Sequence, residues 1–155
     1  MDARNEQTKL VIPALQPIYD ALSPYSYTAL RVLVGLFLFP HGAAKLFGIW
    51  NHSLAATTAF FTKLGLEPAY PLAVTVGVIE CFGGLAIAIG LFTRPVAAAA
   101  TFLLCVAAFK VHLEHGWFWN VRGVEYAVFW ALLCVIIMIR GGGPHSVDAK
   151  IGREI

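Results

Sequence analysis

The chain has 155 residues, of which 59% are hydrophobic and only 13% are charged, and its formal net charge is +2. Soluble domains carry about 25% charged residues, so this chain has too few to cover a water-facing surface. Its length allows one domain, and its mean hydropathy of +0.73 indicates an all-α, polytopic membrane protein. No basic cluster suggests a nucleic-acid partner, so the partner that the composition implies is the lipid bilayer.

The first 22 residues are expected to form a polar tail followed by an interfacial segment. Residues 1–9 are polar, whereas residues 10–22 are mildly amphipathic and interrupted by prolines. Ser23-Pro24 has the residue types of a helix start, with serine as N-cap and proline in the first turn. The mixed charges of this region are not those of a signal peptide, so the first span is expected to direct insertion.

Four apolar runs predict a bundle of four transmembrane helices within residues 23–140. A helix needs about 20 residues to cross the hydrocarbon core, and the fourth run is the shortest. The amphipathic stretch after the first span predicts a short helix on the membrane surface, and residues 141–155 follow the bundle as a tail. The predicted spans lie at about residues 27–47, 70–91, 95–111 and 124–139.

The distribution of basic residues predicts the orientation of the bundle. Four spans place both termini on one side of the membrane. Seven Lys and Arg residues lie at the chain ends and in the turn 92–95, whereas four lie on the opposite side. The positive-inside rule therefore favours cytoplasmic termini.

Ionisable residues collect in the half of the bundle that faces away from the termini. His41 and Lys45 are four residues apart and share a helix face, and Glu80 lies near the centre of the second span. An isolated Lys or Glu there costs roughly 2.5–3.5 kcal/mol, so these groups should pair inside the bundle. We expect Lys45 to pair with Glu80 or Glu125. The candidate cluster is completed by Glu125 and His112 at the outer mouths of the last two spans.

This cluster has a functional and a purely structural interpretation, and the sequence leaves both open. Bis-histidine haem is not favoured, because His41 and the shallower His112 are the nearest match. A loop metal site is a weak alternative, and we predict no metal; its candidate ligands are His52, His112, Glu114 and His115. The cysteines Cys81, Cys105 and Cys134 lie in different apolar runs without a CxxC motif, so a redox dithiol is not expected.

A second group of charges faces the termini. Arg31, Arg94 and Arg140 lie near the cytoplasmic surface, and Arg31 lies about a turn inside the first span. A guanidinium group at that depth needs a specific partner or must snorkel. Asp148 in the tail is expected to fold back onto Arg31 or Arg94 and so tie the tail to the bundle.

The assembled motifs resemble the DoxX family. They are Arg31, HGAAKLFG at 41–48, GVIECFGGLAIAIGLFTRPVA at 77–97, the H…GW…GVEY run at 112–126, and GGGPHSVD at 141–148. The resemblance implies a small four-helix protein of the bacterial-type inner membrane. The matching positions are Arg31, His41, Gly42, Lys45, Glu80, Gly84, Thr93, Arg94, Glu125, Ser146 and Asp148.

The resemblance also implies a link to quinol oxidase and thiosulfate:quinone oxidoreductase assemblies. We therefore expect an accessory subunit of a quinone-linked membrane redox complex, with quinone as the possible ligand and a protein partner that supplies electrons. No self-sufficient catalytic motif is present, so any catalysis would belong to that complex. The alternatives are a non-enzymatic scaffold or assembly factor with structural charges, and a transporter of small solutes or lipids.

Overall fold

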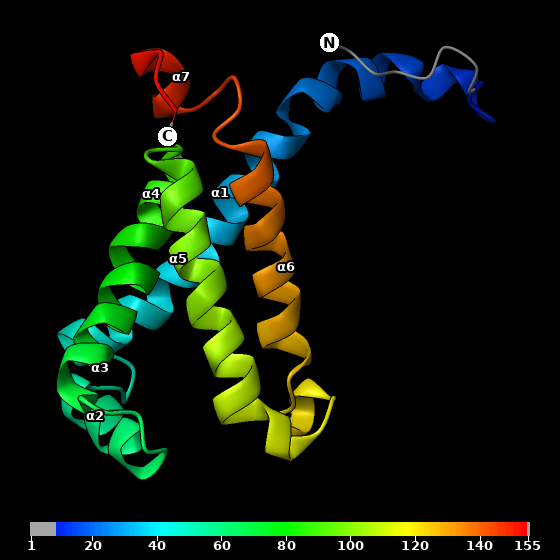
Figure 1. Cartoon of the computed structure of the whole chain (residues 1–155). Coiled ribbons are helices and arrows are strands. Elements are labelled where there is room, and N and C mark those ends of the chain that lie inside the picture. Colours follow the sequence, from blue (N-terminus) through cyan, green and yellow to red (C-terminus); the bar gives the residue numbers. More distant parts are fainter. Residues whose placement is uncertain (1–8, 155) are drawn as a thin grey trace.

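Residues 9–154 are described by a computed structural model, and every regular element in that range is helical (Figure 1). The predicted polar tail lies almost entirely outside these residues. The α-helices are α1 (Gln16–Phe47), α2 (Leu54–Lys63), α3 (Ala69–Val78), α4 (Gly84–Ile89), α5 (Thr93–Val106), α6 (Glu125–Arg140) and α7 (Val147–Ile151). Shorter turns join them: π-helical Ile79–Gly83 and Ala107–His112, and 3₁₀ Pro13–Leu15, Leu113–His115 and Trp119–Val121.

Several of these elements follow one another without a break and form long, continuous apolar helices, called rods here. Within residues 9–154, three rods are long and apolar enough to cross a membrane, namely Pro13–Phe47, Ala69–Ile89 and Thr93–His115. Helix α6 is apolar as well but has only 16 residues, which is short for a span. The chain is therefore an all-helical membrane protein with three candidate spans among these residues.

Helix α1 begins earlier than predicted. The helix start expected at Ser23-Pro24 is wrong, because α1 begins at Gln16 and Pro24 lies inside it. Pro17 occupies the first turn instead, where a missing N–H costs nothing. The early part of α1 runs sideways from the bundle before the helix turns inward (Figure 1), and the helix continues through Pro40.

The bundle is held by close helix packing. Helix α5 packs along α6, and α1 crosses α4 and the π-turn that precedes it. A Cβ atom on Gly35 would overlap the carbonyl oxygen of Gly84, and one on Gly42 would overlap the amide of Cys81. Glycine at these two levels of α1 lets the backbones meet directly, as is common between membrane helices. The buried core is Val34, Leu38, Ile87, Ala97, Ala100, Leu103, Leu104, Ala131, Cys134 and Ile137.

The two ends of the bundle differ in construction. At one end, called here the tail-side end, the α4–α5 turn meets the end of α6 and α7 (Figure 1). At the opposite, loop-side end lie α2 and the connection between α5 and α6 (Figure 1). Helix α2 confirms the predicted short helix and is capped by Ser53, whose Oγ accepts from the Ala56 amide at 3.1 Å.

Candidate functional site

A Lys–Glu ion pair connects the first two spanning rods. Lys45 Nζ lies 2.5 Å from Glu80 Oε2, and it also donates to the carbonyl oxygen of His41 at 3.2 Å. The two side chains are only 20% and 11% exposed. The expected pairing of Lys45 with Glu80 is therefore confirmed, and both charges are satisfied within the bundle.

Glu80 lies on an irregular part of its helix. It belongs to the π-turn Ile79–Gly83, where the helix carries an extra residue between α3 and α4. Such turns are rare and occur often at functional sites. Helix α1 approaches this turn closely because Gly42 contacts the backbone of Gly77 and Cys81. The close approach brings Lys45 within reach of the Glu80 carboxylate.

His41 lies at the edge of this pair. It interacts electrostatically with Glu80, Lys45 and His52, and its side chain is exposed on the surface of the bundle. An imidazole beside a largely hidden ion pair can exchange hydrogen bonds or protons with a ligand that arrives from the bilayer. We call His41, Lys45 and Glu80 the pair site.

The other predicted members of the cluster lie elsewhere. Glu125 Oε2 accepts from the Trp119 amide at 3.1 Å, and His112 Nδ1 lies 2.7 Å from the Arg122 carbonyl oxygen. Both contacts stabilise the loop between α5 and α6. No hydrogen bond or ion pair within residues 9–154 joins these two side chains to Lys45. The predicted five-residue cluster is thus divided between two places.

The weak metal candidates do not form a ligand set in the described part of the chain. His52 lies exposed in the turn before α2, whereas His112 and His115 line a cavity of about 180 Å³ beside Glu114. His115 Nδ1 is 3.8 Å from the Glu114 carboxylate. Across residues 9–154, no three His, Cys, Asp or Glu side chains group as a metal ion requires.

Arg31 is buried at the tail-side end, where only 1% of it is exposed. Its guanidinium group donates to the carbonyl oxygens of Ile87 at 2.6 Å and Ala88 at 2.9 Å, and to that of His145 at 3.0 Å. The carbonyls of a helix C-terminus carry partial negative charge, so they suit a buried cation. Arg31 therefore caps α4 and holds the tail loop.

Asp148 caps the start of α5. Its carboxylate accepts from the Phe92 amide at 2.8 Å, and from the Thr93 amide and hydroxyl at 2.9 and 2.7 Å. The tail folds back onto the bundle through Asp148 as expected, and the charge of Arg31 acts on the carboxylate, but its hydrogen-bond donors belong to Phe92 and Thr93 and not to Arg31 or Arg94. Phe92 adopts a left-handed φ of 47° and its side chain makes no capping bond, so the free amides of α5 need a distant carboxylate.

These contacts determine the titration of Asp148. Burial raises the pKa of the carboxyl group. Hydrogen bonds from Thr93 and Phe92 and the charge of Arg31 lower the pKa, and together they outweigh the effect of burial. The net pKa of Asp148 lies below its ordinary value of 3.8. The carboxylate is therefore ionised at neutral pH, as an amide-binding cap should be.

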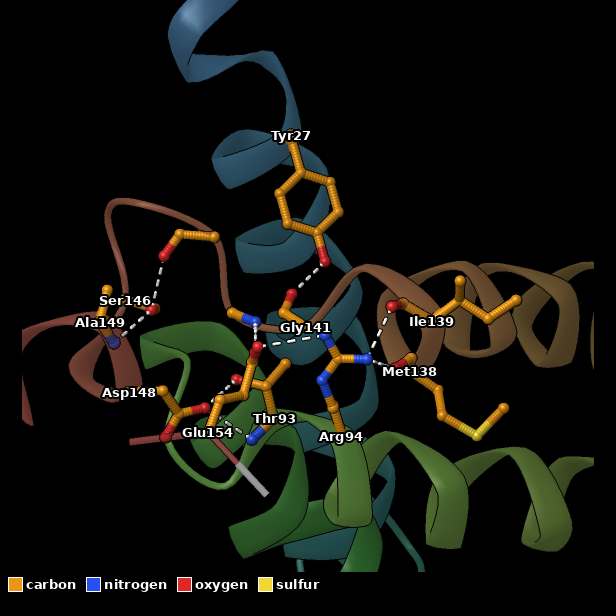
Figure 2. A network of polar contacts seen from close by, with 12 residues as sticks. Tyr27, Thr93, Arg94, Met138, Ile139, Gly141, Ser146, Asp148, Ala149 and Glu154 are labelled. Atoms are coloured by element: carbon orange, nitrogen blue, oxygen red, sulfur yellow. Dashed lines mark hydrogen bonds and ion pairs between the residues drawn. The ribbon is translucent and has the colours of Figure 1, made fainter. Parts of the chain in front are cut away.

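The remaining tail-side residues complete the closure of this end (Figure 2). Arg94 donates to the carbonyl oxygens at the end of α6, the closer being Ile139 at 2.7 Å, and pairs with Glu154 at 3.1 Å. Ser146 Oγ caps α7 by accepting from the Ala149 amide at 3.0 Å. The Tyr27 hydroxyl donates to the Gly141 carbonyl oxygen. Sequence reasoning missed Tyr27 and Glu154, since neither belongs to a motif.

The fold and these two clusters define a class: small helical membrane proteins with a hidden Lys–Glu pair between spans and a tail that caps the bundle. The chain matches DoxX over residues 26–113 and belongs to the DoxX family. The matched region includes the pair site and the start of α5, whereas Glu125 and Asp148 lie beyond it.

Two curated proteins are similar to the chain. Over 134 residues the chain is 27% identical to an uncharacterized protein of Haemophilus influenzae, covering 84% of this chain and 94% of that protein. Over 85 residues it is 34% identical to a Bacillus subtilis protein named "Putative oxidoreductase CatD", covering 55% and 58% of the two chains. No solved structure matches the chain significantly.

Proposed function

We propose that this protein is an accessory subunit of a quinone-linked membrane redox complex and that the pair site contacts the quinone. The observation that carries the proposal is the Lys45–Glu80 ion pair, held at 2.5 Å inside a chain with few charges and beside the exposed His41. Ionisable groups inside membrane segments commonly mark proton or substrate pathways. The name of the Bacillus relative supports a redox role.

The chemistry of quinones matches these side chains. Reduction of a quinone to a quinol takes two electrons and two protons. The carbonyl oxygen gains negative charge as it is reduced, so it needs a hydrogen-bond donor, which His41 or Lys45 provides. Glu80 exchanges a proton with Lys45 or with the quinone oxygen. The electrons come from a protein partner.

Quinone binding tests the proposal directly. In purified protein titrated with a soluble short-chain quinone, His41→Ala and Glu80→Gln should each weaken binding about tenfold or more, since hydrogen bonds to charged groups contribute about 1.5–3 kcal/mol. Tryptophan fluorescence quenching gives the affinity. Glu125→Gln is the matched control, because Glu125 lies in the separate loop contact, and it should bind as the wild type does. Unchanged affinity in both pair-site variants rejects the proposal.

A second candidate function is a scaffold or assembly factor in which the ion pair is purely structural. The short distance between Lys45 and Glu80 favours it, because the pair directly joins α1 to the second rod. This function predicts that breaking the ion pair lowers the stability of the protein and leaves its affinity for quinone unchanged.

We further propose that α6 is a fourth span, that both termini are cytoplasmic, and that the protein lies in the bacterial inner membrane. Helix α6 extends about 24 Å at 1.5 Å per residue and packs along α5, which supports a parallel course through the bilayer. The bacterial origin of the relatives supports the location.

Thiol labelling tests this orientation. Asn120→Cys places a thiol at the loop-side end, and Lys150→Cys places one at the tail-side end; both positions are exposed. In spheroplasts, a membrane-impermeant maleimide should label the first variant at once and the second only after lysis. The unmodified chain, with its own three cysteines, measures the background. The reverse pattern contradicts the orientation, and equal labelling of both variants before lysis contradicts the fourth span.

A further inference from the structure

The tail-side end contains an open hollow that the capping contacts do not fill. It has a volume of about 320 Å³ and lies between the end of α6 and α7. Two glycines, Gly143 and Gly152, contribute no side chain to its wall. The charged side chains that line it are Arg140, Asp148, Arg153 and Glu154.

The carboxylates of the hollow are already engaged. Asp148 accepts from the amides at the start of α5, and Glu154 accepts from the Gly142 amide at 2.5 Å and pairs with Arg94. Within residues 9–154, Arg140 and Arg153 have no carboxylate partner. The hollow therefore presents two arginines without a carboxylate partner, beside Glu154, which is paired with Arg94, and Asp148, which is held by the donors at the start of α5.

Arg140 is held in place for binding. Its guanidinium carbon lies 4.3 Å from the centre of the Tyr27 ring, and such stacking orients the planar group. The same Tyr27 hydroxyl donates to the Gly141 carbonyl oxygen, which fixes the ring. Part of the entropy cost of ordering the arginine is thus met before a ligand arrives.

We infer that the hollow binds the phosphate group of an acidic membrane lipid between Arg140 and Arg153. Guanidinium groups match phosphate with paired hydrogen bonds, and basic pockets at helix ends bind acidic headgroups. Arg140 is the last residue of α6, directly after Ile139, whose side chain is 67% exposed. A phosphate at this level leaves the acyl chains beside the apolar surface of α6. A free phosphate ion offers the same kind of oxygen ligands but gains nothing from that surface.

Lipid-dependent stability tests the inference. Protein in mild detergent is titrated with phosphatidylglycerol, with phosphatidylcholine or with inorganic phosphate, and the unfolding temperature is followed. Phosphatidylglycerol should raise the unfolding temperature of the wild type, and the other two should not. Each arginine near a membrane surface contributes about fivefold to affinity, so the double variant Arg140→Gln/Arg153→Gln should need about 30-fold more lipid.

Two single variants show whether the lipid response depends on the arginines of the hollow. Lys150→Gln removes one positive charge from α7 outside the lining of the hollow and should respond to phosphatidylglycerol as the wild type does. Arg153→Gln alone should weaken the lipid response about fivefold and leaves the stacking of Arg140 on Tyr27 intact. An equal response to the two lipids, or a full response in both Arg153→Gln and the double variant, overturns the inference. A shift produced by inorganic phosphate and not by the lipid overturns the lipid assignment.

Discussion

Replacing Asp148 with alanine is expected to lower the free energy of unfolding by about 2–4 kcal/mol, because it removes three hydrogen bonds to one buried carboxylate. The amides of Phe92 and Thr93 would lose their partner at the start of α5. The tail would also lose its main attachment to the α4–α5 turn. Thermal unfolding in mild detergent, followed by circular dichroism, measures the loss.

The pH dependence provides an independent check on this role. The pKa of Asp148 is lowered in the folded protein, so its contribution is complete above the unfolded-state pKa near 3.8 and disappears as pH falls through the folded-state value. The difference between wild type and Asp148→Ala should therefore shrink below about pH 4. Glu114→Gln is the control, because the Glu114 side chain is 76% exposed and should change stability little. Equal stability of Asp148→Ala and wild type at pH 7 would contradict the capping role.

Breaking the ion pair from one side is expected to have an effect of similar size. Lys45→Met and Glu80→Met should each destabilise the protein by about 3–5 kcal/mol, because each leaves one hidden charge without its partner. The double variant Lys45→Met/Glu80→Met should recover most of this loss, since two apolar side chains fill the same space. Unfolding of the four proteins under one set of conditions gives the coupling energy.

The same double variant separates the two candidate functions. If the pair is only structural, the stable double variant should retain any quinone affinity of the wild type. If the pair site contacts quinone, the double variant should be stable and fail to bind. Lys63→Met is the control for the loss of a lysine, because Lys63 is exposed at the end of α2. Additive losses in the double variant would show that the two charges are not coupled.

The sequence predicted those features that follow from local pattern and from the energetic cost of lipid burial. The short helix α2 agrees with its amphipathic stretch. The pairing of Lys45 with Glu80 followed from the need to neutralise both charges within the bilayer. The choice between Glu80 and Glu125 was not predictable, because it depends on how α1 crosses the second rod at its glycines.

Features that depend on tertiary contacts were not predictable. The local start signal at Ser23-Pro24 was overridden because the helix begins about two turns earlier, with Pro17 in its first turn, and continues through Pro24. Charge alone suggested that Asp148 would pair with an arginine. Its hydrogen-bond partners include backbone amides at the start of α5. The left-handed conformation of Phe92 leaves these amides without a local cap, and no residue pattern in the sequence predicts that conformation.

The capping of α5 by Asp148 also means that α5 is synthesised well before the residue that caps it. The carboxylate lies 55 residues after the Thr93 amide that it accepts from. At about 5–20 residues per second, a ribosome needs about 3–11 seconds to make that stretch. The first turn of α5 therefore lacks its cap while α6 is translated. Closure of the tail-side end is a late event, and a ribosome that stalls after α6 leaves a bundle whose α5 terminus is still open.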